Sequence, residues 1–242
     1  MQYKTDANLA ARQSIYAYQS PEIDIAARTF DLAGVPLGGV VADVGCGNGA
    51  YLAELARRGF GGRAIGADLS PGMLSAARGR GIGAACLVNA DATAFPLRSG
   101  AADLTLAMHM LYHVPSPLDA VRELRRITRP GGRAVVALNG PGHLSALRAA
   151  LAEAGVVRPA DRLPLDEGAT LLRSVFGSVT RHDFVSSLLP PPEAVAAYVR
   201  SMSESQRLAD PEPLVRRVLS LLSPNDPARL ALTSHSGILI CA

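Results

Sequence analysis

The sequence predicts an α/β fold, in which helices cover both faces of a doubly wound, mostly parallel β-sheet. From residue 40 to residue 138, short apolar runs alternate with segments whose apolar residues recur at helical spacing. A glycine-rich turn joins the first apolar run directly to a helical pattern. A last short apolar run at residues 236–241 predicts an antiparallel final strand. We therefore expect a seven-stranded sheet and a small helical cap, in a single domain over residues 1–242.

The composition of the chain fits one domain with a buried core. Hydrophobic residues make up 48% of the 242 residues and aromatic residues 5%, which is enough for a core without a second full domain. The formal charge of +3 comes from scattered arginines, so no basic tract indicates nucleic-acid binding. Cys46, Cys86 and Cys241 are too widely separated for a disulfide framework or a zinc site. The polar N-terminus and the lack of an apolar run of about 18 residues predict a cytoplasmic protein.

Residues 1–35 predict two short helices separated at Ser20-Pro21, the second over residues 22–32. Tyr16 and Tyr18 precede this break in a polar segment without glycine. They can line a ligand pocket or be half-buried packing residues, and the sequence supports both interpretations equally.

Residues 40–52 are the stretch around which the rest of the chain is organised. Small and apolar residues lead into Asp43, glycines alternate at Gly45, Gly47 and Gly49, and a helical pattern begins at once. Without β-carbons this turn can lie directly against a ligand, toward which the first N–H groups of the helix also point. The dinucleotide pattern G-x-G-x-x-A is satisfied too, so an NAD(P)-dependent oxidoreductase, or a turn that serves sterics alone, is an alternative. The extra Gly49 and the Asp43 carboxylate favour a cationic ligand over a pyrophosphate.

The pattern Asp43-x-Gly45-x-Gly47-x-Gly49 resembles motif I of the class I S-adenosylmethionine (SAM) dependent methyltransferases, in a small-molecule branch similar to the ubiquinone-biosynthesis methyltransferases. The resemblance extends over about residues 36–140. It implies a Rossmann-like sheet, SAM as the cofactor and a SAM-binding core at residues 36–140. It also implies that the methionine end of SAM is held by Asp43 and by the turn of Gly45, Cys46, Gly47, Asn48 and Gly49.

A second apolar run at residues 63–68 ends in Asp68, a little over twenty residues beyond the first glycine. At this spacing an acidic residue reaches a ribose diol, in SAM and in NAD alike. Ser70-Pro71 then predicts the start of a helix. The resemblance implies that Leu69 packs on the adenine, with Met73 nearby.

Residues 84–89 form a third apolar run, which is followed by Asp91 and Ala92. The resemblance implies that the Asp91 carboxylate accepts from the adenine N6 amino group and that the Ala92 N–H serves N1. Taken alone, an aspartate at a strand end more often forms an Asx turn.

Residues 103–108 predict a fourth strand that runs into His109, Tyr112 and His113. The carboxyl ends of central parallel strands line the ligand crevice, and histidine is suited to proton transfer near neutrality. We therefore predict His113 as base or acceptor-orienting group, Tyr112 in the pocket wall, Tyr16 closing over both, and His109 nearer the cofactor. Alternatively, both histidines only satisfy backbone groups. Their spacing of four would suit zinc on a helix, but no third ligand is evident and we expect no metal.

The rest of the chain predicts a helix from Ser116-Pro117, a fifth strand at residues 133–138, a helix at 143–154 and a strand at 178–185. Helical patterns follow at residues 193–202 and 213–222, and no element is assigned at 155–177. The resemblance implies that lid helices at residues 1–35 and a helical insert at 186–235 shape the acceptor pocket.

Together these features predict a SAM-dependent methyltransferase that acts on an O, N or C nucleophile of a small molecule, with a natural-product or aromatic compound as acceptor. We expect neither a nucleic acid nor a membrane as partner. The alternatives are an NAD(P)-dependent oxidoreductase and a non-catalytic SAM-binding or scaffold protein. The identity of the acceptor and the choice between monomer and homodimer stay open.

Overall fold

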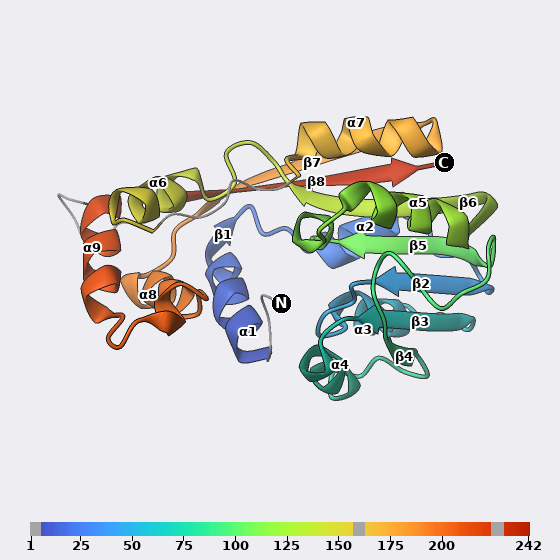
Figure 1. Cartoon of the computed structure of the whole chain (residues 1–242), viewed down its shortest axis with the longest axis horizontal. Coiled ribbons are helices and arrows are strands. Elements are labelled where there is room, and N and C mark those ends of the chain that lie inside the picture. Colours follow the sequence, from blue (N-terminus) through green and yellow to red (C-terminus); the bar gives the residue numbers. More distant parts are fainter. Residues whose placement is uncertain (1–5, 157–162, 224–229) are drawn as a thin grey trace.

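The computed structural model describes residues 6–156, 163–223 and 230–242. Its centre is an eight-stranded sheet in the order β1-β7-β8-β6-β5-β2-β3-β4 (Figure 1). The strands are β1 (Gln19–Ser20), β2 (Val40–Val44), β3 (Arg63–Asp68), β4 (Cys86–Asn89), β5 (Ala102–Met108), β6 (Thr128–Asn139), β7 (Val179–Leu188) and β8 (Leu232–Cys241). All the predicted strands are present. The two-residue β1 corrects the expected number from seven to eight, because so short a strand leaves no pattern in the sequence.

The parallel strands bring their carboxyl ends to one edge of the sheet. β2 pairs in parallel with β3 and β5, and β5 pairs in parallel with β6. Val44 lies beside Ala67 and Met108 beside Ala137, so the residues that follow these strands meet at this carboxyl edge. β8 is antiparallel to both β6 and β7, which confirms the predicted antiparallel last strand. In Figure 1 the carboxyl edge faces α1 (Asp6–Gln13).

Helices cover both faces of the sheet, as the α/β prediction requires. On one face, α2 (Ile25–Ala33) and α3 (Ala50–Arg57) contribute Phe30 and Leu55 to a hydrophobic cluster with Leu106 of β5. On the other, α5 (Pro117–Ile127) and α7 (Leu165–Phe176) contribute Ile127 and Leu172 to a cluster with the alternate residues of the same strands. Helix α4 (Pro71–Arg78) follows β3. The parallel core is therefore buried from both sides.

Side-chain caps fix where several helices begin. Ser70 Oγ accepts a hydrogen bond from the Met73 N–H at the start of α4, and Ser116 Oγ accepts one from the Asp119 N–H at the start of α5. Both predicted helix starts are thereby confirmed. Helix α2 begins at Ile25, three residues later than predicted, because the Asp24 carboxylate caps it by accepting from the Ala27 N–H (2.9 Å).

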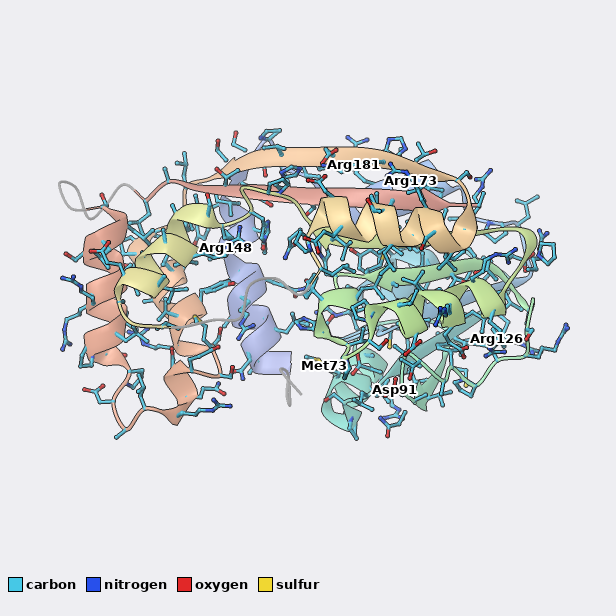
Figure 2. The ribbon with its side chains drawn as sticks, turned by 45° about the horizontal axis from the view of Figure 1, so that its top comes forward. Met73, Asp91, Arg126, Arg148, Arg173 and Arg181 are labelled. Atoms are coloured by element: carbon cyan, nitrogen blue, oxygen red, sulfur yellow. The ribbon has the colours of Figure 1, made fainter. Side chains whose placement is uncertain are left out.

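A buried carboxylate ties α5 to the loop that precedes β5. Glu123 accepts hydrogen bonds from the Phe95 N–H (2.8 Å) and from the Arg126 guanidinium (2.6 Å). Arg126, labelled in Figure 2, also donates to the Phe95 carbonyl (3.1 Å). The Arg126 hydrogen bond holds the pKa of Glu123 below its usual value. Loss of this carboxylate would leave a buried N–H and a guanidinium without their acceptor.

A separate helical cap lies beyond the carboxyl edge. It consists of η1 (Ser14–Tyr18), α6 (Ser145–Glu153), α8 (Pro192–Arg200) and α9 (Glu212–Leu222). β7 and β8 reach past the core and contribute Leu188 and Leu232 to the hydrophobic cluster of the cap, together with Ile15 and Leu147 (Figure 1). Helix α1 packs on α8 and also touches α4, so it bridges the cap and the core.

The predicted insert falls in the cap, whereas the predicted lid over residues 1–35 is divided: α1 and η1 lie at the cap, and α2 packs on a face of the sheet. β7 ends at Leu188 and β8 begins at Leu232, which makes the insert slightly shorter than the predicted residues 186–235. Residues 1–5 of the lid and 224–229 of the insert lie outside the described residues. Among the described helices, none has the length and hydropathy to cross a membrane.

Candidate cofactor and acceptor site

The glycine turn after β2 has the open shape that the sequence predicts. Gly45, Gly47 and Gly49 have φ angles of 71°, 54° and 75°, which favour glycine. A β-carbon on Gly45 would lie 2.9 Å from the Met110 side chain, and one on Gly49 3.0 Å from Ala77. A β-carbon on Gly47 would meet no protein atom within 4 Å. Packing therefore explains two of the glycines, whereas Gly47 borders space that a ligand can fill.

Asp43 carries a buried carboxyl at the end of β2, beside this turn. Its side chain is fully buried, and neither oxygen has a hydrogen-bond partner among the described residues. Burial, and secondarily the charge of Asp68, raise the pKa of Asp43 to about 7. Such a carboxyl is stabilised by a cationic group placed next to it. The neighbouring Cys46 and Asn48 of the turn are also buried.

Asp68 lies at the end of β3 and faces the turn. Its Oδ2 accepts from the Gly47 N–H (2.9 Å) and its Oδ1 from the Ser70 N–H (2.8 Å). Each carboxylate oxygen has a further lone pair, which is the arrangement that a ribose diol needs. The next residue, Leu69, is 54% exposed and offers an apolar surface, whereas Met73 is only 2% exposed and lies in the interior.

Asp91 forms the Asx turn that was the alternative explanation for this position. Its Oδ1 accepts from both the N–H and the hydroxyl of Thr93, each at 2.8 Å, and these hydrogen bonds lower the pKa of Asp91. Both bonds use the same oxygen, so the Asx turn is compatible with a contact from Oδ2 to an adenine. Ala92 follows and is half-buried. Figure 2 labels Asp91 and Met73 on the part of the molecule that contains the sheet, away from α6.

The segment after β5 brings two of the predicted residues together but is not an α-helix. His109 has a left-handed backbone (φ 52°), and only Leu111–His113 form a short 3-10 helix, η2. The spacing of four therefore does not place His109 and His113 on one helix face. The rings of Tyr112 and His113 meet edge to face with centroids 4.5 Å apart, and His113 is exposed. Burial lowers the pKa of His109 to about 4, partly opposed by a hydrogen bond with Asn139.

Two histidines at the same edge were missed from the sequence. His143 follows the turn after β6, and its Nε2 lies 3.1 Å from the Tyr16 hydroxyl oxygen, with the two rings stacked. The His235 N–H of β8 donates to Nδ1 of His143 (3.2 Å), and His235 Nε2 lies 2.6 Å from Asp183. The sequence signal that could have identified His143 is its position directly after the N-G-P-G turn that follows β6. In the described ranges, no three His, Cys, Asp or Glu side chains form a group that could hold a metal ion.

Comparison with known proteins identifies the domain that carries this site. Residues 42–136 match the family described as Methyltransferase domain. The chain contains a SAM-dependent methyltransferase domain. A methyltransferase domain takes SAM as its cofactor, which favours methyl transfer over the NAD(P)-dependent oxidoreductase alternative.

Three relatives show how far the likeness extends. An uncharacterised methyltransferase of Mycobacterium sp. (strain KMS) is 32% identical over 174 residues, which are 68% of this chain and 66% of that protein. A tRNA (carboxymethyluridine(34)-5-O)-methyltransferase of Mus musculus is 35% identical over 111 residues, which are 43% of this chain and 15% of that protein. A third protein, phosphoethanolamine N-methyltransferase 2 of Haemonchus contortus, has a solved structure in complex with phosphomonomethylethanolamine and S-adenosylhomocysteine. Its structure superposes on this chain with a TM-score of 0.61 at 16% sequence identity. The match covers 98% of this chain and 57% of that protein. The chain thus spans about two thirds or less of the length of these proteins.

The residues at the carboxyl edge fit SAM. The turn leaves room at Gly47, and the buried carboxyl of Asp43 lacks a positive partner among the described residues. Both features suit a ligand that carries an ammonium and a sulfonium group. Asp68 and Leu69 add a diol acceptor and an exposed apolar side chain on the same edge.

Proposed function

We propose that the methyltransferase transfers the methyl group of SAM to an O, N or C nucleophile of a small molecule, and that it belongs to the branch resembling the ubiquinone-biosynthesis methyltransferases. The observation that carries the proposal is the buried, unpartnered carboxyl of Asp43 beside the open position at Gly47. Bound SAM supplies a methyl group activated by a cationic sulfur. The protein then needs mainly to position the acceptor and to exclude water.

The cofactor contacts in this proposal follow the carboxyl edge. Asp43 and the turn hold the methionine end, and Asp68 accepts from the ribose hydroxyls. Leu69 packs against the adenine, and Asp91 with the Ala92 N–H pairs with its edge. Met73 supports this pocket from the interior, because its side chain is too buried to offer a surface. His109 lies nearer the cofactor than His113.

The cap favours a small acceptor over a polymer. Two of its arginines are paired with carboxylates: Arg200 bonds Glu212 at 2.6 Å and 2.9 Å, and Arg217 lies 3.7 Å from Glu153. The tRNA methyltransferase matches 43% of this chain and only 15% of its own length is covered, so its printed substrate does not carry over to this chain. Salt-dependent retention of tRNA or DNA on a filter would overturn the proposal of a small acceptor.

His113, Tyr112 and Tyr16 form the acceptor side of the proposed site. His113 is exposed beside Tyr112 at the end of β5, where a base or an orienting group can reach the nucleophile. We expect His113→Ala to lower turnover by about a hundredfold with SAM affinity unchanged. Turnover within about threefold of the wild type between pH 6 and pH 9 would remove His113 from the proposal.

The experiment that tests the function is calorimetric titration with SAM, S-adenosylhomocysteine and NADH, followed by a screen for S-adenosylhomocysteine production with aromatic and natural-product acceptors. We expect SAM and S-adenosylhomocysteine to bind, NADH not to bind, and at least one acceptor to be methylated. Binding of SAM with no product from any acceptor class would favour a non-catalytic SAM-binding or scaffold role. Failure of SAM to bind would refute the assignment of the site.

A further inference from the structure

The hydrogen bonds of His143 determine which ring nitrogen carries its proton. Nδ1 accepts from the His235 N–H at 3.2 Å, so the lone pair of Nδ1 is in use. A neutral imidazole has one N–H and one lone pair, and the proton must therefore lie on Nε2. Nε2 lies 3.1 Å from the Tyr16 hydroxyl oxygen and donates to it. In this tautomer His143 cannot take a proton from Tyr16, because Nε2 already carries one.

The surroundings of His143 keep its ring neutral. The side chain is 7% exposed, and the charged or ionisable groups that face it are His109 after β5, His235 from β8 and Arg148 from α6, with Tyr16 of η1 as its hydrogen-bond partner. Burial first, and then the electrostatic influence of His109, Arg148 and His235, lowers the pKa of His143 to about 3. Figure 2 shows Arg148 on α6 in the cap.

A second layer of contacts holds the His235 backbone in place. The Gly140 N–H donates to the His235 carbonyl (2.8 Å), and a β-carbon on Gly140 would collide with the His235 ring. His235 Nε2 bonds Asp183 at 2.6 Å, and Asp183 accepts two bonds from Arg181 at 2.6 Å and 2.9 Å. Figure 2 labels Arg181 on β7. The residue whose N–H determines the His143 tautomer is thus held by contacts from the turn after β6 and from β7.

We propose that Tyr16 contacts the acceptor nucleophile through its hydroxyl. In this proposal His143 is a positioning residue. Its neutral ring donates the hydrogen bond that holds the Tyr16 hydroxyl in place, and it does not act as a base. The proposal rests on the proposed methyl transfer, since it assigns the half-buried Tyr16 to the acceptor side of that site. Tyr16 lies in η1 of the cap and His143 follows β6, so their contact joins the cap to the carboxyl edge, where the acceptor would be held. The proton that the acceptor loses does not pass to His143.

The state of His143 is testable in the protein without any ligand. Long-range ¹H–¹⁵N correlation spectra distinguish the two neutral tautomers and the imidazolium, and the missing signals of His143→Gln assign the ring. We expect a neutral ring protonated on Nε2 at every pH from 5 to 8. A proton on Nδ1, or titration of this ring between pH 5.5 and pH 7.5, would overturn the proposal.

The role of the donor is testable by comparing two substitutions. Glutamine places an N–H close to the position of Nε2 but cannot act as a base, whereas alanine removes the donor. With an acceptor found in the screen, we expect His143→Gln to keep kcat within about fivefold, and His143→Ala and Tyr16→Phe each to lower it about thirtyfold or more. The kcat of His143→Gln should keep the wild-type pH profile. Equal loss in glutamine and alanine variants that remain folded would point to a base and refute the donor role.

Two controls separate this proposal from the proposed function. SAM affinity should stay unchanged in His143→Gln and Tyr16→Phe, because neither residue belongs to the proposed cofactor contacts, and both variants should remain folded at the assay temperature. Loss of SAM binding in Tyr16→Phe would place Tyr16 at the cofactor and overturn its acceptor role. If the wild type methylates no acceptor, the methyl transfer and the role of Tyr16 both fail, and the spectra still decide the tautomer of His143.

Discussion

The buried carboxyl of Asp43 links the stability of the protein to cofactor binding. Burial and the nearby Asp68 raise its pKa from 3.8 to about 7. Between these two values the folded state holds a proton that the unfolded chain releases. A group with a raised pKa therefore contributes stability that is fully present below pH 3.8 and is lost as the pH rises through about 7. A difference of three pKa units corresponds to on the order of 4 kcal/mol.

The substitution Asp43→Asn keeps the size of the side chain and removes its ionisation. At pH 8 we expect the variant to unfold at a higher temperature than the wild type, by on the order of 10 °C for a chain of this length. At pH 5 the carboxyl is protonated in the folded state but ionised in the unfolded chain, so the difference should shrink to about 2 kcal/mol, or on the order of 5 °C. Scanning calorimetry of the ligand-free proteins between pH 5 and pH 8 measures this difference. Asp119→Asn, an exposed change on α5, is the control and should shift neither value.

Cofactor affinity should change in the opposite direction. A cationic ligand favours the ionised carboxylate, so the affinity of the wild type for SAM should fall by about tenfold between pH 7.5 and pH 6. Asp43→Asn should bind SAM at least about tenfold more weakly at pH 7.5, without this pH dependence. Equal stability of the two proteins at pH 8 would refute the buried ionised carboxylate, and a pH-independent wild-type affinity would refute its link to SAM.

Three further predictions concern the proposed cofactor contacts at the carboxyl edge and the stability of the fold. Asp68→Ala should weaken SAM binding by about 2 kcal/mol or more, about thirtyfold by calorimetry, and a loss below tenfold would show that Asp68 is not the ribose acceptor. Gly47→Ala should weaken SAM binding much more than Gly81→Ala, because both glycines have a positive φ and an open β-carbon position but only Gly47 borders the proposed ligand; equal effects would contradict this. Glu123→Ala should lower the free energy of unfolding by about 2–3 kcal/mol at pH 7, against less than about 1 for Asp119→Ala. The difference in unfolding free energy between the wild type and Glu123→Ala should shrink below pH 4.5. The pKa of Glu123 is lowered in the folded state, so the stability that its carboxylate contributes is lost as the pH falls.

Local sequence was sufficient to predict seven of the eight strands and to place the residues of the proposed cofactor contacts at strand ends. Strands buried on both faces show as apolar runs, and Asp43, the glycine turn and Asp68 each follow such a run directly. The N-caps at Ser70 and Ser116 are local too. Helix α7 escaped prediction although its buried residues recur at helical spacing. It contains Gly168, which weakens a helical pattern but has a packing reason, because a β-carbon there would collide with the Leu138 side chain of β6.

The acceptor side depended on contacts that no local pattern contains. Tyr16 and His143 are 127 residues apart, and His143 and His235 are 92 apart, so their pairing follows from the topology of the sheet. The left-handed backbone of His109 likewise separates it from the helix face that its spacing to His113 indicates. Tertiary structure determines where these side chains lie, whereas the proposed cofactor contacts follow from a turn of a few consecutive residues.

The position of β8 has a consequence for the order in which the sheet is assembled. β8 lies between β6 and β7, although it follows both in the sequence. While the chain is being synthesised, β2 to β6 can pair among themselves, but β7 has only the two residues of β1 as a partner until β8 emerges. Until then, β6 and β7 present unpaired edges to the solvent, and such edges invite pairing with other chains. The insertion of β8 closes both edges in one step, and it also joins the cap to the core.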